Sequence, residues 1–192
     1  MSRAEILKRY KVHMARRRAE QAAERTAFSS TISGFLLGSV GEIGVHEFGH
    51  YVASKIFGND VSIEFRADGF HTLPYTDHVR SAIEEFLIPM GGPIADYIFS
   101  VAALIYANRA KADSTTRRPM AAAYSVIASV FPLAQSVYTF SNSGDFHYLD
   151  NFGIPKVAQV AAAAAIGLPI ALLGVREVYK TFKNIEERSE RV

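Results

Sequence analysis

The sequence predicts an all-α polytopic membrane protein with about four transmembrane helices, a small β-hairpin after the first of them and a basic amphipathic N-terminal helix. The 192-residue chain contains four apolar segments of about 20 residues, which is the length that crosses a bilayer. Its charged residues are concentrated near the ends of these segments and of the chain. It contains no cysteine, which excludes a disulfide framework and a thiolate metal site.

Residues 1–26 are expected to form a basic amphipathic helix. They carry eight Lys or Arg residues against three Glu residues, a net charge of +5. Such a helix serves either as an anchor on an anionic membrane surface or as a docking element for partner subunits. A helix that is only solvated explains the same pattern equally well.

A single membrane domain is expected over residues 27–180, followed by a charged tail over residues 181–192. Its helices are predicted at about 27–57, 86–108, 119–141 and 156–180. A β-hairpin at about 61–74 is predicted from weak alternation and from the Asp68-Gly69 turn signal. A soluble helical core is the weaker interpretation, because a small domain can bury one wholly apolar helix but not four.

The Lys and Arg residues of the connections predict the orientation in the membrane. Residues 1–26, the 109–118 loop and the end of the chain from Arg176 contain eight, four and five of them. The 58–85 and 142–156 connections contain only two and one. We therefore expect both termini and the 109–118 loop on one side of the membrane, and the hairpin and the 142–155 loop on the other.

The ionisable residues within the apolar segments are few and clustered. They are Glu42, His46, Glu47, His50 and Asp96, and Asp145 follows directly after the third segment. Lys55 is not counted among them, because it lies near a helix end and its side chain can reach the membrane interface. An ionisable group inside a membrane is energetically expensive and marks a functional site by default.

His46 and His50 are four residues apart, so they lie on one face of a helix, and Glu47 projects close to that face. This H-E-x-x-H pattern is typical of zinc metalloproteases. There, zinc lowers the pKa of water to about 7, and the glutamate takes the water proton and later delivers it to the leaving amine. We expect Zn²⁺ as the cofactor, His46 and His50 as ligands and Glu47 as the catalytic base.

Catalytic zinc usually has three protein ligands, so a third must come from elsewhere. Asp145 is favoured because it follows the third segment on the same side of the membrane as His50, and His147 is the alternative. Glu42 lies four residues before His46 and either orients its imidazole or packs in the bundle interior. Ordinary surface or hairpin roles are expected for the other histidines, His13, His71 and His78.

Three motifs in this order resemble the site-2 protease family of intramembrane zinc metalloproteases, of which the chain would be a small, divergent member with a three-helix core. HEFGH at 46–50 resembles the ligand-bearing helix of that family. GGPIAD at 91–96 resembles its second signature, Gly-Pro followed by two residues and Asn. SGDFHYL at 143–149 stands where the family supplies its aspartate ligand. The resemblance covers roughly residues 28–150.

The resemblance implies that His46, His50 and Asp145 are ligands and that Glu47 is the general base. It further implies that Gly92, Pro93 and Asp96 lie near the site and help to position the substrate, and that the hairpin holds the substrate as an added strand. The chain departs from the family at two positions. Asp96 replaces the usual Asn, which is a hydrogen-bond donor, and Phe146 follows the aspartate where the family has Gly.

The expected function is hydrolysis of peptide bonds in transmembrane segments of substrate proteins by a zinc endopeptidase. The alternative is a catalytically inactive, protease-like subunit with a structural role in a larger membrane complex. The small size and the two departures favour this alternative, whereas the intact Glu47 disfavours it. A metal or ion transporter is a weaker interpretation, because residues 119–141 and 157–175 contain no charged residue.

The expected partners are the lipid bilayer and either transmembrane substrate proteins or partner membrane subunits, and not nucleic acid. The expected location is a bacterial or archaeal cell membrane or an organellar inner membrane.

Overall fold

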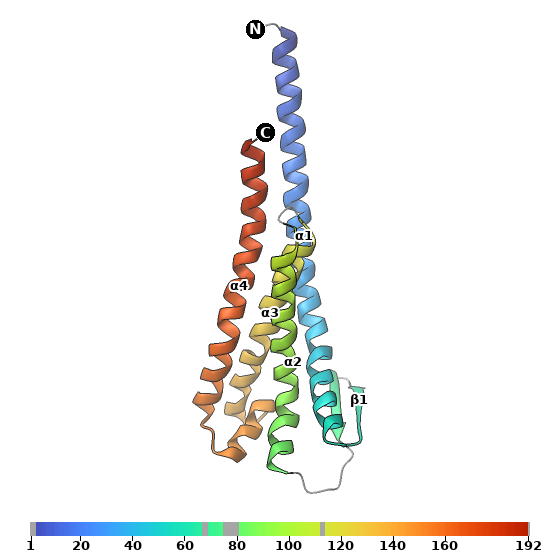
Figure 1. Ribbon diagram of the computed structural model, residues 1–192, viewed down its shortest axis with the longest axis vertical. Coiled ribbons are helices and arrows are strands. Elements are labelled where there is room, and N and C mark those ends of the chain that lie inside the picture. Colours follow the sequence, from blue (N-terminus) through green and yellow to red (C-terminus); the bar gives the residue numbers. More distant parts are fainter. Residues whose placement is uncertain (1–2, 67–68, 75–80, 112–113, 192) are drawn as a thin grey trace.

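Four long helices make up most of the computed structural model, which describes residues 3–66, 69–74, 81–111 and 114–191 (Figure 1). For residues 65, 66, 69–74 and 189–191 it describes the backbone alone. The helices are α1 (Arg3–Ile56), α2 (Ala82–Arg109), α3 (Arg117–Tyr138) and α4 (Lys156–Arg191). Two 3₁₀ helices, η1 (Thr139–Ser141) and η2 (Asp145–Phe152), connect α3 to α4.

Each of the four helices is long and apolar enough to cross a membrane. Their outer faces expose large apolar side chains, such as Leu36, Val40 and Leu172, whereas fully buried positions include Ser100 and Ser125. Apolar residues outside and small polar residues inside are typical of helices that pack in lipid. The structure is therefore consistent with an integral membrane protein.

The first helix is one uninterrupted element of 54 residues. At about 1.5 Å per residue it is about 80 Å long, more than twice the thickness of a hydrocarbon core. Residues 3–26 include no buried residue, and the start of α1 reaches beyond the ends of the other helices (Figure 1). Residues 20–27 are mainly Ala, Glu and Arg, which favour a helix, so the two helices that the sequence separates near residue 26 are joined.

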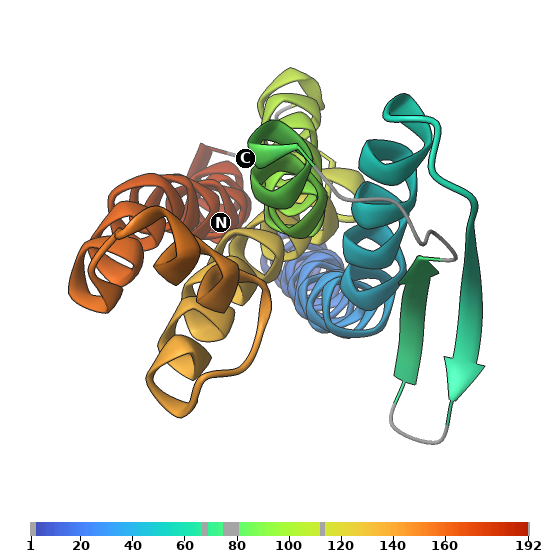
Figure 2. The same cartoon turned by 90° about the horizontal axis from the view of Figure 1, so that it is seen from below.

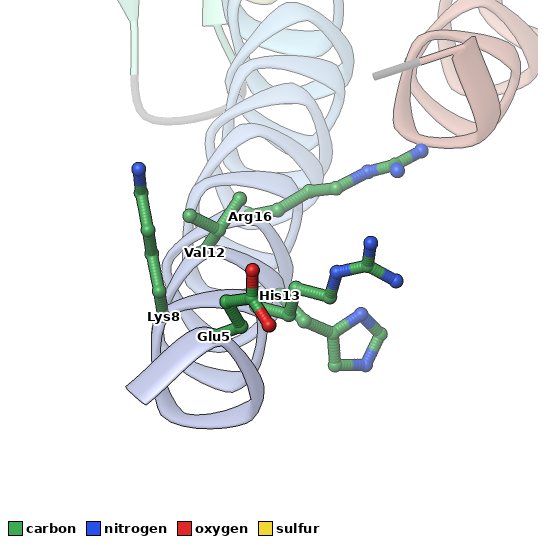
Figure 3. Close-up of a pocket in the computed structure, with 6 residues that line it drawn as sticks. Glu5, Lys8, Val12, His13 and Arg16 are labelled. Atoms are coloured by element: carbon green, nitrogen blue, oxygen red, sulfur yellow. The ribbon is translucent and has the colours of Figure 1, made fainter. Parts of the chain in front are cut away.

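The exposed start of α1 is strongly basic. Figure 3 shows a surface pocket there, and all the side chains that line it come from this one helix: Glu5, Lys8, Arg9, Val12, His13 and Arg16. Because α1 continues without a break into the bundle, this end points along the bundle axis (Figure 1). His13 is exposed, as expected.

Helix α3 lies at the centre of the bundle and contacts the other three helices. Small residues allow this close packing. An added Cβ at Gly34 of α1 would overlap the carbonyl oxygen of Met120, and one at Gly174 of α4 would overlap Ser125. Glycine at these positions lets the helix backbones approach each other closely.

Two short strands, β1 (Val61–Arg66) and β2 (Gly69–Pro74), follow α1. They pair antiparallel, with Val61 opposite Pro74 and Arg66 opposite Gly69. The strands lie beside the C-terminal end of α1 (Figure 2). Asp68 of the predicted turn and His78 fall outside the described residues, and the side chain of His71 is not described.

Both ends of the chain lie at one end of the bundle, and the strands, η1 and η2 lie at the other (Figure 1). Residues 181–191, for which a separate charged tail was predicted, continue α4. The connection between α2 and α3 is at the same end as the termini, so the three basic regions of the sequence are gathered there.

Candidate metal centre

The site forms where the backbones of α1 and α2 come into direct contact. A Cβ on Gly49 would overlap the carbonyl oxygen of Gly91, and a Cβ on Gly91 would overlap the carbonyl oxygen of Gly49. Only glycine at both positions permits this approach. It places His50, which follows Gly49, directly against Gly92, which follows Gly91.

The three side chains that the sequence selects as metal ligands converge at this contact. The Nε2 atoms of His46 and His50 are 3.1 Å apart. The carboxylate of Asp145 reaches both rings, with Oδ2 at 2.7 Å from His46 Nε2 and Oδ1 at 3.3 Å from His50 Nε2. Two donor atoms around a tetrahedral zinc lie about 3.3 to 3.6 Å apart. The shortest separation here, between His46 Nε2 and Asp145 Oδ2, must therefore widen by roughly half an ångström for a zinc ion to bind.

Hydrogen bonds on the far side of each ring orient the two imidazoles. His46 Nδ1 donates to Asp96 Oδ2 at 2.7 Å, and His50 Nδ1 donates to the carbonyl oxygen of Ile88 at 2.8 Å. A carbonyl only accepts, so the proton of His50 is on Nδ1 even though the amide nitrogen of Gly92 lies 3.4 Å from that atom. This leaves the Nε2 lone pairs of both rings facing each other, an arrangement that a cation between them stabilises.

Gly92 provides the space for such a cation. A Cβ at this position would lie 2.5 Å from His50 Nε2 and 2.6 Å from His46 Nε2. Pro93, which is fully buried, and Pro89 lie in the same part of α2 and each removes a backbone N–H donor from the helix. The donor set, the ring orientations and this space fit a zinc ion.

Asp145 is held in place by the anchoring of η2. The chain reaches it through Gly144, whose φ of +78° strongly favours glycine. Phe146 and Leu149 then pack into a buried cluster with Met90 of α2 and Ala163 of α4. Phe146, which follows the aspartate where the family that the motifs resemble has Gly, therefore serves as the apolar anchor of the turn that carries Asp145.

Burial raises the pKa of the Asp145 carboxyl, but its close contacts with the imidazoles of His46 and His50 outweigh burial and hold this pKa well below its usual range. An ionised carboxylate is the form that a metal ligand requires. The pKa of the Asp150 carboxyl is also lowered. Burial raises this pKa, but the hydrogen bond from Gln159 and the positive charge of Lys156 lower it by more.

His147, the alternative third ligand, does not face the other two histidines. Its Nδ1 lies 3.1 Å from Asp150 Oδ2, and its side chain is 40% exposed. The structure therefore brings Asp145, and not His147, to His46 and His50.

Glu47 lies at the same site. A carboxylate oxygen of Glu47 and donor nitrogens of His46 and His50 all lie within 4.8 Å of one another. The residue is partly exposed, whereas both histidines are buried. A carboxylate at this distance reaches a water molecule between the donors and can act as a general base.

The two buried carboxyls near His46 have different surroundings. Asp96 takes the Nδ1 hydrogen bond, so the orienting role considered for Glu42 belongs to Asp96. Asp96 thus contacts the side of the ring that faces away from the donors, and does not lie where a reacting carbonyl would bind. Glu42 is fully buried, and its oxygens have no hydrogen-bond partner in the part of the chain that the structure describes.

Sequence reasoning missed two residues of α3 at the site. Gln135 Nε2 lies 3.3 Å from His46 Nε2, and the ring of Phe131 packs edge to face against that imidazole at 5.7 Å between centroids. The available signal was weak: Gln135 is the one amide side chain in the apolar segment 119–141.

Comparisons with protein-family models, with curated proteins and with solved structures found no match.

Proposed function

We propose that this chain is an intramembrane zinc endopeptidase that hydrolyses peptide bonds in transmembrane segments of other proteins. The observation that carries the proposal is the convergence of His46, His50 and Asp145 beside Glu47, inside a bundle of helices apolar enough to cross a membrane. The proposal includes membership of the site-2 protease family, which the three motifs resemble.

Each residue has a defined role in this proposal. His46, His50 and Asp145 hold zinc, which when bound polarises a carbonyl group and acidifies water. Glu47 takes a proton from the attacking water molecule while the oxygen of that water bonds to the carbonyl carbon. Glu47 then delivers the proton to the amide nitrogen as the C–N bond breaks, which yields one carboxylate product and one amine product.

The substrate must unwind before it is cleaved, because each carbonyl of a helix is shielded by its own hydrogen bond. The β1–β2 pair lies beside the end of α1 that carries His50. We infer that an unwound substrate segment pairs with the free edge of this pair. The proposed location is a bacterial or archaeal cell membrane or an organellar inner membrane.

The decisive experiment compares the wild-type protein with Glu47→Gln after purification in detergent. The substitution keeps the size of the side chain and removes the base, so both proteins should contain about one zinc per chain. Only the wild type should cleave a reporter that contains a transmembrane helix. Glu85→Gln, at an exposed position near the start of α2, is the matched control and should cleave normally.

The measurements are metal content by mass spectrometry and cleavage by gel electrophoresis. Removal of zinc with a chelator should abolish cleavage, and added zinc should restore it. A wild-type protein without zinc would refute the metal site. Cleavage that survives Glu47→Gln would refute the assigned base.

The start of α1 favours one alternative function, a protease-like subunit that has a structural role in a membrane complex. The start of α1 projects beyond the other helices and exposes apolar as well as basic side chains, among the apolar ones Ile6, Leu7 and Tyr10. Such a surface suits a partner protein. Stoichiometric zinc without cleavage by the wild type, together with fixed partner subunits after purification, would favour this alternative.

A further inference from the structure

Gln135 presents an amide group to the proposed catalytic site. Its Nε2 lies 3.3 Å from His46 Nε2, the atom that also faces Asp145 and His50. Phe131, one turn earlier on α3, contacts the same ring. One face of α3 therefore also borders the site, and Gln135 is its polar member.

The amide of Gln135 is only partly satisfied. Its Oε1 is buried and accepts no hydrogen bond from any residue that the structure describes. Its Nε2 donates only toward the imidazole lone pair, which would be occupied once a metal binds. Buried polar groups nearly always have partners, so an amide left open at both ends points to a group outside this chain.

A peptide backbone has the matching chemistry. A primary amide carries a donor and an acceptor side by side. A residue in an extended strand presents its own N–H and C=O on the same side, and can pair with both. A residue inside a helix has neither group free, because both are used by the hydrogen bonds of the helix.

We propose that Gln135 binds the backbone of the substrate at the site, with Nε2 donating to a carbonyl oxygen and Oε1 accepting from an N–H of the same residue. This inference rests on the proposed function and makes it more specific. Gln135 selects substrate segments that are extended and rejects those that remain helical. The role falls to Gln135 because the carboxyl of Asp96 is already paired with His46.

The test measures binding of a peptide to proteins that cannot cleave it. The probe is a fluorescent apolar peptide with a central Gly-Pro pair, which prevents a helix. Its dissociation constant is compared between Glu47→Gln and the double variant Glu47→Gln/Gln135→Met. We expect the Met side chain, which has a similar size and no amide, to weaken binding roughly tenfold to a hundredfold. Zinc content should stay at about one per chain.

Two further variants make the result specific. Gln135→Glu keeps an acceptor but loses the donor, and should also weaken binding with zinc retained, so it serves if the Met variant does not fold. Gln21→Met, at an exposed position of α1, is the matched control and should bind as tightly as the parent.

The outcomes separate this inference from the proposed function. Unchanged peptide affinity in both Gln135 variants, with cleavage by the wild type, would overturn the role of Gln135 and leave the protease intact. Loss of zinc in the Met variant would also overturn it, because Gln135 would then be holding the metal. Weaker binding by the variants, with no cleavage by the wild type, would support Gln135 and refute the protease.

Discussion

Gly92 lies where any side chain would fill the space between the two donor nitrogens. A single methyl group there would come within 2.6 Å of both Nε2 atoms. We therefore predict that Gly92→Ala weakens zinc binding by a factor of about 100 or more, because the ion and the methyl group compete for one space. Zinc content after dialysis against a graded series of chelators measures the effect.

Gly41→Ala is the control for this substitution. It lies on the same helix as His46, but its added Cβ meets no atom within 4 Å, and Ala favours a helix more than Gly does. This variant should bind zinc as the wild type does. Normal zinc binding by Gly92→Ala would mean that the ion does not sit between His46 and His50.

At the scale of the elements, the positions of the four apolar segments follow from the sequence, whereas the pairing of the buried carboxyls does not. The apolar segments predict where helices run, because about 20 residues span a bilayer whatever their neighbours are. The choice between Glu42 and Asp96 as the partner of His46 depends on the rotation of α1 against α2. The Gly49–Gly91 contact sets that rotation, and no periodicity within one segment reveals it.

Asp145 and Gln135 illustrate the same distinction. Asp145 could be selected because its charge is conspicuous directly after an apolar segment. Gln135 could not be selected from the sequence, because a neutral amide in an apolar helix is no strong sign of a functional site. Only the fold shows that it faces His46. The continuity of α1 was missed for another reason. The charge pattern changes near residue 26, but the tendency to form a helix does not.

A buried ion pair connects α3 to α4 at the end of the bundle where the termini lie. Arg118 donates to Glu177 from Nε at 3.1 Å and from its terminal nitrogen at 2.5 Å, and both residues are buried. Lys180 also contacts Glu177. We predict that Arg118→Met lowers the free energy of unfolding by about 2 to 4 kcal/mol, because it leaves a buried carboxylate with one remaining partner.

Unfolding in detergent, followed by circular dichroism, measures this loss. Replacing both partners, in Arg118→Met/Glu177→Leu, should recover most of the stability, because no buried charge is left unpaired. Lys183→Met removes an exposed pair with Glu187 and should have little effect. If Arg118→Met and Lys183→Met lowered the free energy of unfolding equally, burial would not be what makes the Arg118–Glu177 pair important for stability.

At the scale of the whole molecule, charge divides the protein into two ends. The termini and the α2–α3 connection carry most of the Lys and Arg residues, and the strands and the turn that carries Asp145 lie at the opposite end. Four crossings of a membrane place both termini on one side. The rule that basic segments remain in the cytoplasm would then place the candidate metal centre nearer the outer side.

This orientation can be tested directly because the chain has no cysteine of its own. We predict that single cysteines at Tyr10 and Lys111 are protected from a membrane-impermeant maleimide in intact cells, and that one at Asn151 reacts. All three positions are exposed, so a lack of reaction reflects the membrane and not burial in the protein. After the cells are permeabilised, all three should react equally. If the cysteines at Lys111 and Asn151 react from the same side, α3 does not cross the membrane, and neither four crossings nor a metal centre inside the bilayer would stand.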